Sequence, residues 1–147
     1  MLKNFKTQEL VDPGTYAGMG ENALTVFKPL ALIMIDNFAT FWKQKGAQYI
    51  ICNNWHLDGQ FQWRGYRTVE AARKLGSPTG HEQHQAGNAF DVDVQGYTAE
   101  AVRQIVKDNQ DDPLLQLIMR LEANVNWTHL DGKILLPPEE RIYEFIA

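Results

Sequence analysis

The stretch that decides the expected fold is His84-Gln85-Ala86-Gly87-Asn88-Ala89-Phe90-Asp91-Val92-Asp93-Val94. Its second half alternates strictly. Successive side chains of a strand point to opposite faces, so Ala89, Asp91 and Asp93 would share one face and the apolar residues the other. This pattern predicts a half-buried strand over 89–94 that carries two carboxylates away from the core. A turn at Gly87, where glycine tolerates positive φ, would bring His84 back to Asp91.

Working outward, the sequence predicts a mixture of helices and short strands. Capping residues, prolines and apolar periodicity place helices after Pro29, Thr68, Thr98 and Asp112 and at 137–147, with a turn at Asp12-Pro13-Gly14. Strands are expected at 48–53 and 89–94, and a hairpin with arms at 119–122 and 127–131. The predicted fold class is α+β, with a small antiparallel sheet flanked by helices. We expect a single domain over 1–147, whose first part, 1–28, is an N-terminal lead-in segment.

Composition narrows the function classes. The chain has 147 residues, 14 Lys and Arg against 18 Asp and Glu, a net charge of −4 and a single cysteine. Without a basic stripe, nucleic acid is not an expected partner. The N-terminus lacks the apolar region of a signal peptide, so we expect synthesis in the cytoplasm, and the longest apolar run, 30–35, is too short to insert in a membrane. Composition leaves the oligomeric state open.

A second polar strand pattern lies downstream of the first. In Trp127-Thr128-His129-Leu130-Asp131, the residues Trp127, His129 and Asp131 share one face. Together with His84 and Asp91, His129 would supply two imidazoles and one carboxylate. Three protein ligands leave a fourth tetrahedral position open, which is typical of catalytic rather than structural zinc sites. Isolated His and Asp residues are otherwise mostly surface groups or satisfied core groups.

These residues resemble the M15 family of zinc metallopeptidases, which includes D-alanyl-D-alanine carboxypeptidases and phage endolysins and shares a fold with the Hedgehog signalling domain. The H-x-x-G-x-A-x-D motif of the family stands at 84–91, a W-x-H-x-D-like strand at 127–131 and a GYR element at 65–67. The resemblance covers roughly residues 28–131. Within the family, this sequence is similar to a phage-encoded subgroup.

The resemblance implies a site and a substrate. One zinc ion would be held by His84, Asp91 and His129, and Arg67 would bind a substrate carboxylate or stabilise the oxyanion. Further residues would contact the substrate or support the ligands: Asp131, Asp93, Glu82, Tyr66 and Trp127. The implied partner is a peptidoglycan stem peptide, cut at a bond involving a D-amino acid. A phage lysis or virion enzyme would reach this substrate in the bacterial cell wall.

Two positions depart from the family pattern. Glu82 replaces a usual serine, and Asn126 stands where many members have a catalytic acid/base. Glu122 is the candidate replacement. If 123–126 form a four-residue hairpin loop, Glu122 pairs with Trp127 and shares a face with His129, from where it could exchange protons with water and the leaving amine. The alternative is that Glu122 only pairs with Arg120.

Two other functions fit parts of the pattern. Asn126 would suit a catalytically inactive descendant that binds peptidoglycan or serves as a phage structural protein. The element His129-Leu130-Asp131 imitates part of the facial triad of non-haem Fe(II) oxygenases. That triad needs a distal histidine, and none of the 16 residues after Asp131 is one.

Overall fold

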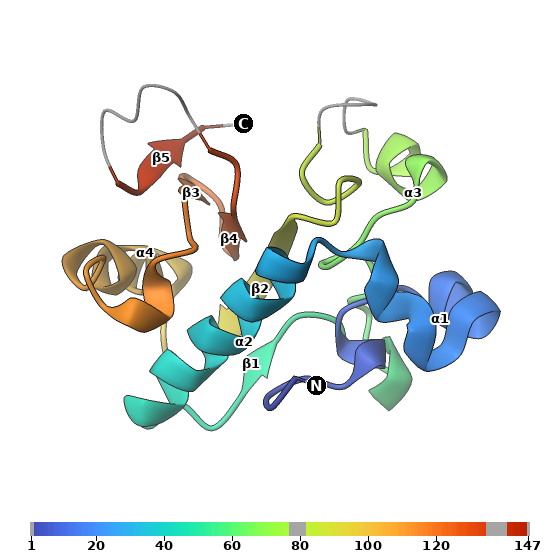
Figure 1. The fold of residues 1–147 in the computed structure, drawn as a ribbon, viewed down its shortest axis with the longest axis horizontal. Coiled ribbons are helices and arrows are strands. Elements are labelled where there is room, and N and C mark those ends of the chain that lie inside the picture. Colours follow the sequence, from blue (N-terminus) through green and yellow to red (C-terminus); the bar gives the residue numbers. More distant parts are fainter. Residues whose placement is uncertain (1, 77–81, 135–140, 147) are drawn as a thin grey trace.

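A single five-stranded sheet organises the chain (Figure 1). The computed structural model describes residues 2–76, 82–134 and 141–146. The strands lie in the order β1-β2-β4-β3-β5, with bounds Ile50–Ile51 for β1, Ala89–Val94 for β2, Arg120–Glu122 for β3, Thr128–Asp131 for β4 and Tyr143–Phe145 for β5. Within the described residues the sheet is combined with four α-helices, which makes the fold class α+β, as predicted.

The register of β2 on β4 sets the site. These two strands run antiparallel, and Asp91 is the register partner of His129. The predicted strand over 89–94 is therefore confirmed, with Phe90 and Val92 fully buried, but the expectation that it is only half-buried was wrong, because Ala89 and Asp91 on its other face are buried as well.

The C-terminal prediction was wrong in the described residues. A helix was expected over 137–147, but Tyr143–Phe145 form β5, which lies parallel to β3 and makes the sheet mixed rather than wholly antiparallel. Residues 135–140 and 147 of that prediction lie outside the described residues. The local Pro-Pro-Glu-Glu pattern is typical of a helix start, but Ile142 is buried in the core and directs the next residues onto the free edge of β3.

The four helices are α1 (Pro13–Met19), α2 (Pro29–Gln44), α3 (Val69–Lys74) and α4 (Ala99–Asp108). The predicted caps at Thr68 and Thr98 are present, each accepting a hydrogen bond from a backbone N–H of its helix. The expected turn at Asp12 is instead the start of α1, because the Asp12 side chain caps the helix and Pro13 fits its first position. The helix expected after Asp112 was wrong: in the described residues 113–118 the chain forms a single 3-10 turn, η4 (Pro113–Leu115), before it enters β3.

The core lies between the helices and one face of the sheet. In Figure 1, α2 crosses in front of β2, which it contacts, and α4 packs against β2 and β4. Buried side chains of these two helices join the apolar residues of the strands in one cluster, including Phe38, Trp42, Val102, Phe90 and Leu130. The opposite face carries the polar residues of β2 and β4 and meets the backbone and side chains of 64–67 and 82–88.

Among the described residues, no single helix is long and apolar enough to cross a membrane. The segments Pro13–Val26 and Pro29–Gln44, which are bent by 91° relative to each other, have sufficient length and apolar composition only when taken together. Most of the apolar residues of the second segment are buried in the core.

Candidate metal centre

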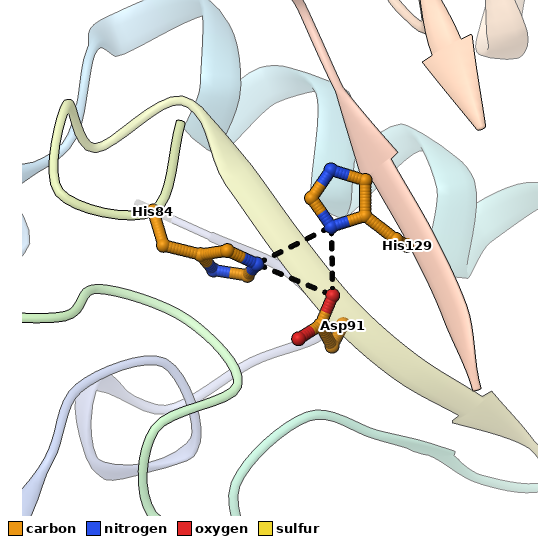
Figure 2. Close-up of side chains that lie close together, drawn as sticks. All are labelled: His84, Asp91 and His129. Carbon is orange, nitrogen blue, oxygen red and sulfur yellow. Dashed lines mark hydrogen bonds and ion pairs between the residues drawn. The ribbon is translucent and has the colours of Figure 1, made fainter. Parts of the chain in front are cut away.

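Three buried side chains converge on one point of the polar face (Figure 2). His84 comes from the loop before β2, Asp91 from β2 itself and His129 from β4. Asp91 Oδ1 lies 2.8 Å from His129 Nδ1 and 3.2 Å from His84 Nε2, and the two imidazole nitrogens are 3.3 Å apart. These atoms are close enough together to bind one metal ion.

Gly87 makes the return of His84 possible. Its φ is +63°, which L side chains rarely adopt, and a Cβ built there would overlap the carbonyl oxygen of Val26. The Gly87 carbonyl also accepts a hydrogen bond of 2.8 Å from the backbone N–H of Lys28. The expected turn at Gly87 is thus present, and it is packed tightly against the segment that leads into α2.

Each imidazole is fixed in one tautomer by the group on its far side. His84 Nδ1 lies 2.7 Å from the carbonyl oxygen of Gly65, which only accepts, so this nitrogen carries the proton. His129 Nε2 donates in the same way to Asp131 Oδ2 at 3.0 Å. The lone pairs of His84 Nε2 and His129 Nδ1 are left to face Asp91 Oδ1.

Three acceptor atoms therefore meet among side chains that are largely buried. Such an arrangement is stable only with a positive charge between them, which is the requirement that a metal ion meets. Hydrogen bonds from backbone and carboxylate groups to the outer ring nitrogens are also what metal-binding histidines usually have. The chemistry of the donor set fits a metal ion.

The pKa values of Asp91 and His129 also favour a positive charge at this site. Burial opposes ionisation of Asp91, but the charge of His84 and the hydrogen bond from His129 outweigh it and hold the pKa of Asp91 well below its ordinary range. Burial likewise disfavours charge on His129, yet the hydrogen bonds to Asp131 and Asp91 raise its pKa to about 9. Both shifts favour a positive charge between the imidazoles and Asp91, whether a proton or a metal ion carries it.

Asp131 is fully buried and supports His129 from behind. Its carboxylate accepts a bidentate interaction from Arg120, with Arg120 Nη2 at 2.6 Å from Asp131 Oδ2. Burial opposes ionisation of Asp131, but His129 and Arg120 lower its pKa. Because Asp131 faces the outer nitrogen of His129, these two residues do not converge on one metal position as an oxygenase triad would.

Sequence reasoning missed Phe145. The ring of this β5 residue lies edge-on to His129, with 5.6 Å between centroids, and 4.3 Å beneath the guanidinium carbon of Arg120. It therefore packs against the ligand and its support. The alternation of aromatic residues in Tyr143-Glu144-Phe145 was the only local signal, and the expected helix obscured it.

Glu122 lies on the same face as His129, but not by the expected pairing. Leu121 pairs with Leu130, so the register continued by one residue sets Glu122 opposite His129 rather than Trp127. The shift is two residues, which preserves the face. Partial burial raises the pKa of Glu122, while the charges of His129 and Asp91 act on it in opposite directions. The alternative partner Arg120 is bonded to Asp131 instead.

Arg67 makes its contacts within the protein. Its guanidinium bonds Asp91 Oδ2 at 2.6 Å through Nη2 and pairs with Glu82 through Nη1. Glu82 is therefore neither a metal neighbour nor an exposed group, but the partner of Arg67. Asp93, on the same strand face as Asp91, pairs with Arg64.

Three further predicted residues lie around the site. The Tyr66 ring packs against Phe27, with 6.2 Å between centroids, as part of the core. Trp127 is half-buried, and its Nε1 is buried without a hydrogen-bond partner in the described part of the chain. Asn126 is exposed and lines a pocket of about 420 Å³ together with Asp93 and Thr128.

No family model, curated protein or solved structure matches this chain. The chemistry of the site is therefore inferred from its own residues.

Proposed function

We propose that the protein is a zinc-dependent peptidase of the Hedgehog/DD-peptidase fold that hydrolyses peptidoglycan stem peptides at a bond involving a D-amino acid. The observation that carries the proposal is the convergence of His84 Nε2, His129 Nδ1 and Asp91 Oδ1, with both imidazole tautomers fixed from behind. The M15-like motifs at 65–67, 84–91 and 127–131 supply the substrate class.

Zinc suits this donor set because two imidazoles and one carboxylate are the ligands of a catalytic site with an open fourth position. When bound, a zinc ion supplies Lewis acidity that activates water and polarises the scissile carbonyl. The chain's own residues do the rest: Gly65 and Asp131 hold the imidazole rings, and Arg67 holds Asp91 by the oxygen that faces away from the histidines.

Glu122 is the proton carrier in this proposal. It lies across from His129 in β3, between β4 and β5, it is half-buried, and it has no ion pair among the described residues. A carboxylate there can take a proton from the attacking water and deliver it to the leaving amine. This would replace the acid/base that Asn126 cannot provide.

The test is a digest of purified peptidoglycan followed by mass spectrometry. Samples of the protein would be zinc-loaded, chelated, and reloaded with zinc. We expect D-alanine or stem fragments to be released only when zinc is present. A phage lysis or virion enzyme would meet this substrate in the host wall, so walls from several bacteria should be compared.

The variant Glu122→Gln distinguishes a peptidase from a domain that only binds peptidoglycan. We expect this variant to keep its zinc and to lose turnover about 10²–10⁴-fold. The matched control is Glu144→Gln, whose carboxylate pairs with Lys107 away from the ligands. If the wild-type protein held one zinc ion and released nothing from any wall, a peptidoglycan-binding or phage structural role would replace the peptidase.

A further inference from the structure

Each of the three guanidinium nitrogens of Arg67 already bonds an acceptor within the protein. Arginine recognises a carboxylate by presenting two adjacent N–H groups in parallel. Along one edge of Arg67, Nε bonds the Trp63 carbonyl at 2.7 Å and Nη2 bonds Asp91. Along the other edge, Nη1 pairs with Glu82. The side chain is only 14% exposed, so these contacts lie inside the protein.

The charge of Arg67 is also already balanced. Two carboxylates face this one cation, and both are largely buried, Glu82 at 13% and Asp91 at 6% exposure. A substrate carboxylate would have to compete with these two carboxylates for the one guanidinium. Displacing Glu82 would leave a buried charge without a partner, which is strongly unfavourable.

The neighbouring guanidinium groups are committed in the same way. In the described residues around the ligands, Arg64 pairs with Asp93, and Arg120 pairs with Asp131. No arginine there has an unneutralised charge with which to anchor the C-terminus of a peptide. An exopeptidase that recognises a free carboxylate needs such an anchor.

Glu82 adds a preference of its own. Its Oε2 is buried and, within the described residues, accepts no hydrogen bond. A second anion beside this unpaired acceptor would be unfavourable, because a carboxylate brings no hydrogen-bond donor.

We propose that Glu82 holds Arg67 on Asp91, so that Arg67 positions a metal ligand, and that the bond hydrolysed at this site lies inside a peptide rather than beside a free C-terminal carboxylate. This inference rests on the proposed peptidase function. It makes Glu82 and Arg67 positioning residues and assigns endopeptidase specificity to the site.

The test compares two synthetic stem pentapeptides that end in D-alanyl-D-alanine, one with a free carboxylate and one with a C-terminal amide. Both are titrated into the zinc-loaded full chain by NMR and incubated with it for mass spectrometry. We expect the amide to bind and react at least as well as the carboxylate. A preference of tenfold or more for the free carboxylate, in binding or in kcat/KM, overturns the proposal. If neither peptide is cleaved, the peptidase function fails, while the binding ratio still decides the question of the carboxylate anchor.

Glu82→Gln tests the positioning role without turnover. Removing this charge should free Arg67, lower zinc affinity about tenfold in a chelator competition, and shift the binding ratio at least fivefold toward the carboxylate peptide. Glu144→Gln, which removes a carboxylate paired with Lys107, is the matched control and should change neither quantity. Zinc affinity and binding ratio both unchanged in Glu82→Gln would overturn the role of Glu82. The wild-type comparison stands even if this variant does not fold.

Discussion

Asp131 bonds the outer ring nitrogen of His129 and so determines which nitrogen of this histidine can bind a metal ion. It accepts the Nε2 proton of His129 and so leaves Nδ1 free to bind a metal. Asp131→Asn should lower zinc affinity about 10–100-fold, as removal of such supporting partners typically does. A chelator competition measures this change.

The control for Asp131→Asn is Asp12→Ala, which removes another largely buried carboxylate, the one that caps α1. It should lower the free energy of unfolding by about 0.5–2 kcal/mol and leave zinc affinity unchanged. Equal losses of zinc affinity in the two variants would mean that Asp131 acts only through general stability.

Glu122 should set the acidic limb of the pH profile. Burial raises its pKa, and the residue can accept a proton only when ionised, so kcat/KM should fall as pH drops through a value above the ordinary glutamate range. Zinc occupancy would be measured at each pH to separate this effect from loss of the ion. An unchanged limb in Glu122→Gln would assign the limb to another group.

For single residues, the sequence predicts which side chains lie together at the site, but not which hydrogen-bond or ion-pair partner each of them has. Motif spacing and strand alternation pointed to His84, Asp91 and His129, which the structure brings together. The pairing of Arg67 with Glu82 depends on side-chain conformations across two loops, which no local pattern encodes. Glu122 kept its face despite a two-residue shift in register, because side chains repeat every two residues along a strand.

At the scale of elements, the turn at Gly87 is the joint between the loop of His84 and the strand of Asp91. Gly87→Ala should lower the free energy of unfolding by about 2–5 kcal/mol, since it combines positive φ with overlap on Val26. Gly96→Ala is the matched control, because Gly96 also has positive φ but has no atom within 4 Å of the Cβ position. Urea denaturation measures both, and equal losses would show that the contact with Val26 is unimportant.

Strand β5 brings Phe145 against His129 and Arg120. Phe145→Ala should lower the free energy of unfolding by about 1–3 kcal/mol, less than for a fully buried ring, and weaken zinc binding severalfold. Tyr143→Ala, in the same strand but exposed, should change zinc affinity less than twofold. Identical zinc affinities in the two variants would exclude a role for the Phe145 ring in the site.

The elements that the sequence predicts well are those with local signals. Strict alternation marked β2, and a proline start with apolar periodicity marked α2, whose helical span agrees with the prediction. The prediction failed where pairing partners lie far apart in the chain. β5 is a strand because it pairs with the edge of β3, and the local sequence of 137–147 does not indicate this pairing with a distant segment.

At the scale of the whole molecule, the proposed metal ion should add stability. At a zinc concentration 100 times the Kd, binding contributes about 2.7 kcal/mol, which for a domain of this size raises Tm by roughly 5–10 °C. Differential scanning calorimetry with and without chelator measures the shift. His84→Ala should abolish it, whereas His56→Ala, in the 3-10 turn η3 (Trp55–Leu57), should retain it.

The ligands Asp91 and His129 are 38 positions apart, and α4, η4 and β3 lie between them. An ion shared by these residues would act as a removable cross-link that closes a long loop, much as a disulfide does in an oxidising compartment. The bound ion would mainly suppress local opening motions that separate β2 from β4. Chelation should therefore expose the segment between the two ligands to proteases and speed amide exchange there, well before the chain as a whole unfolds.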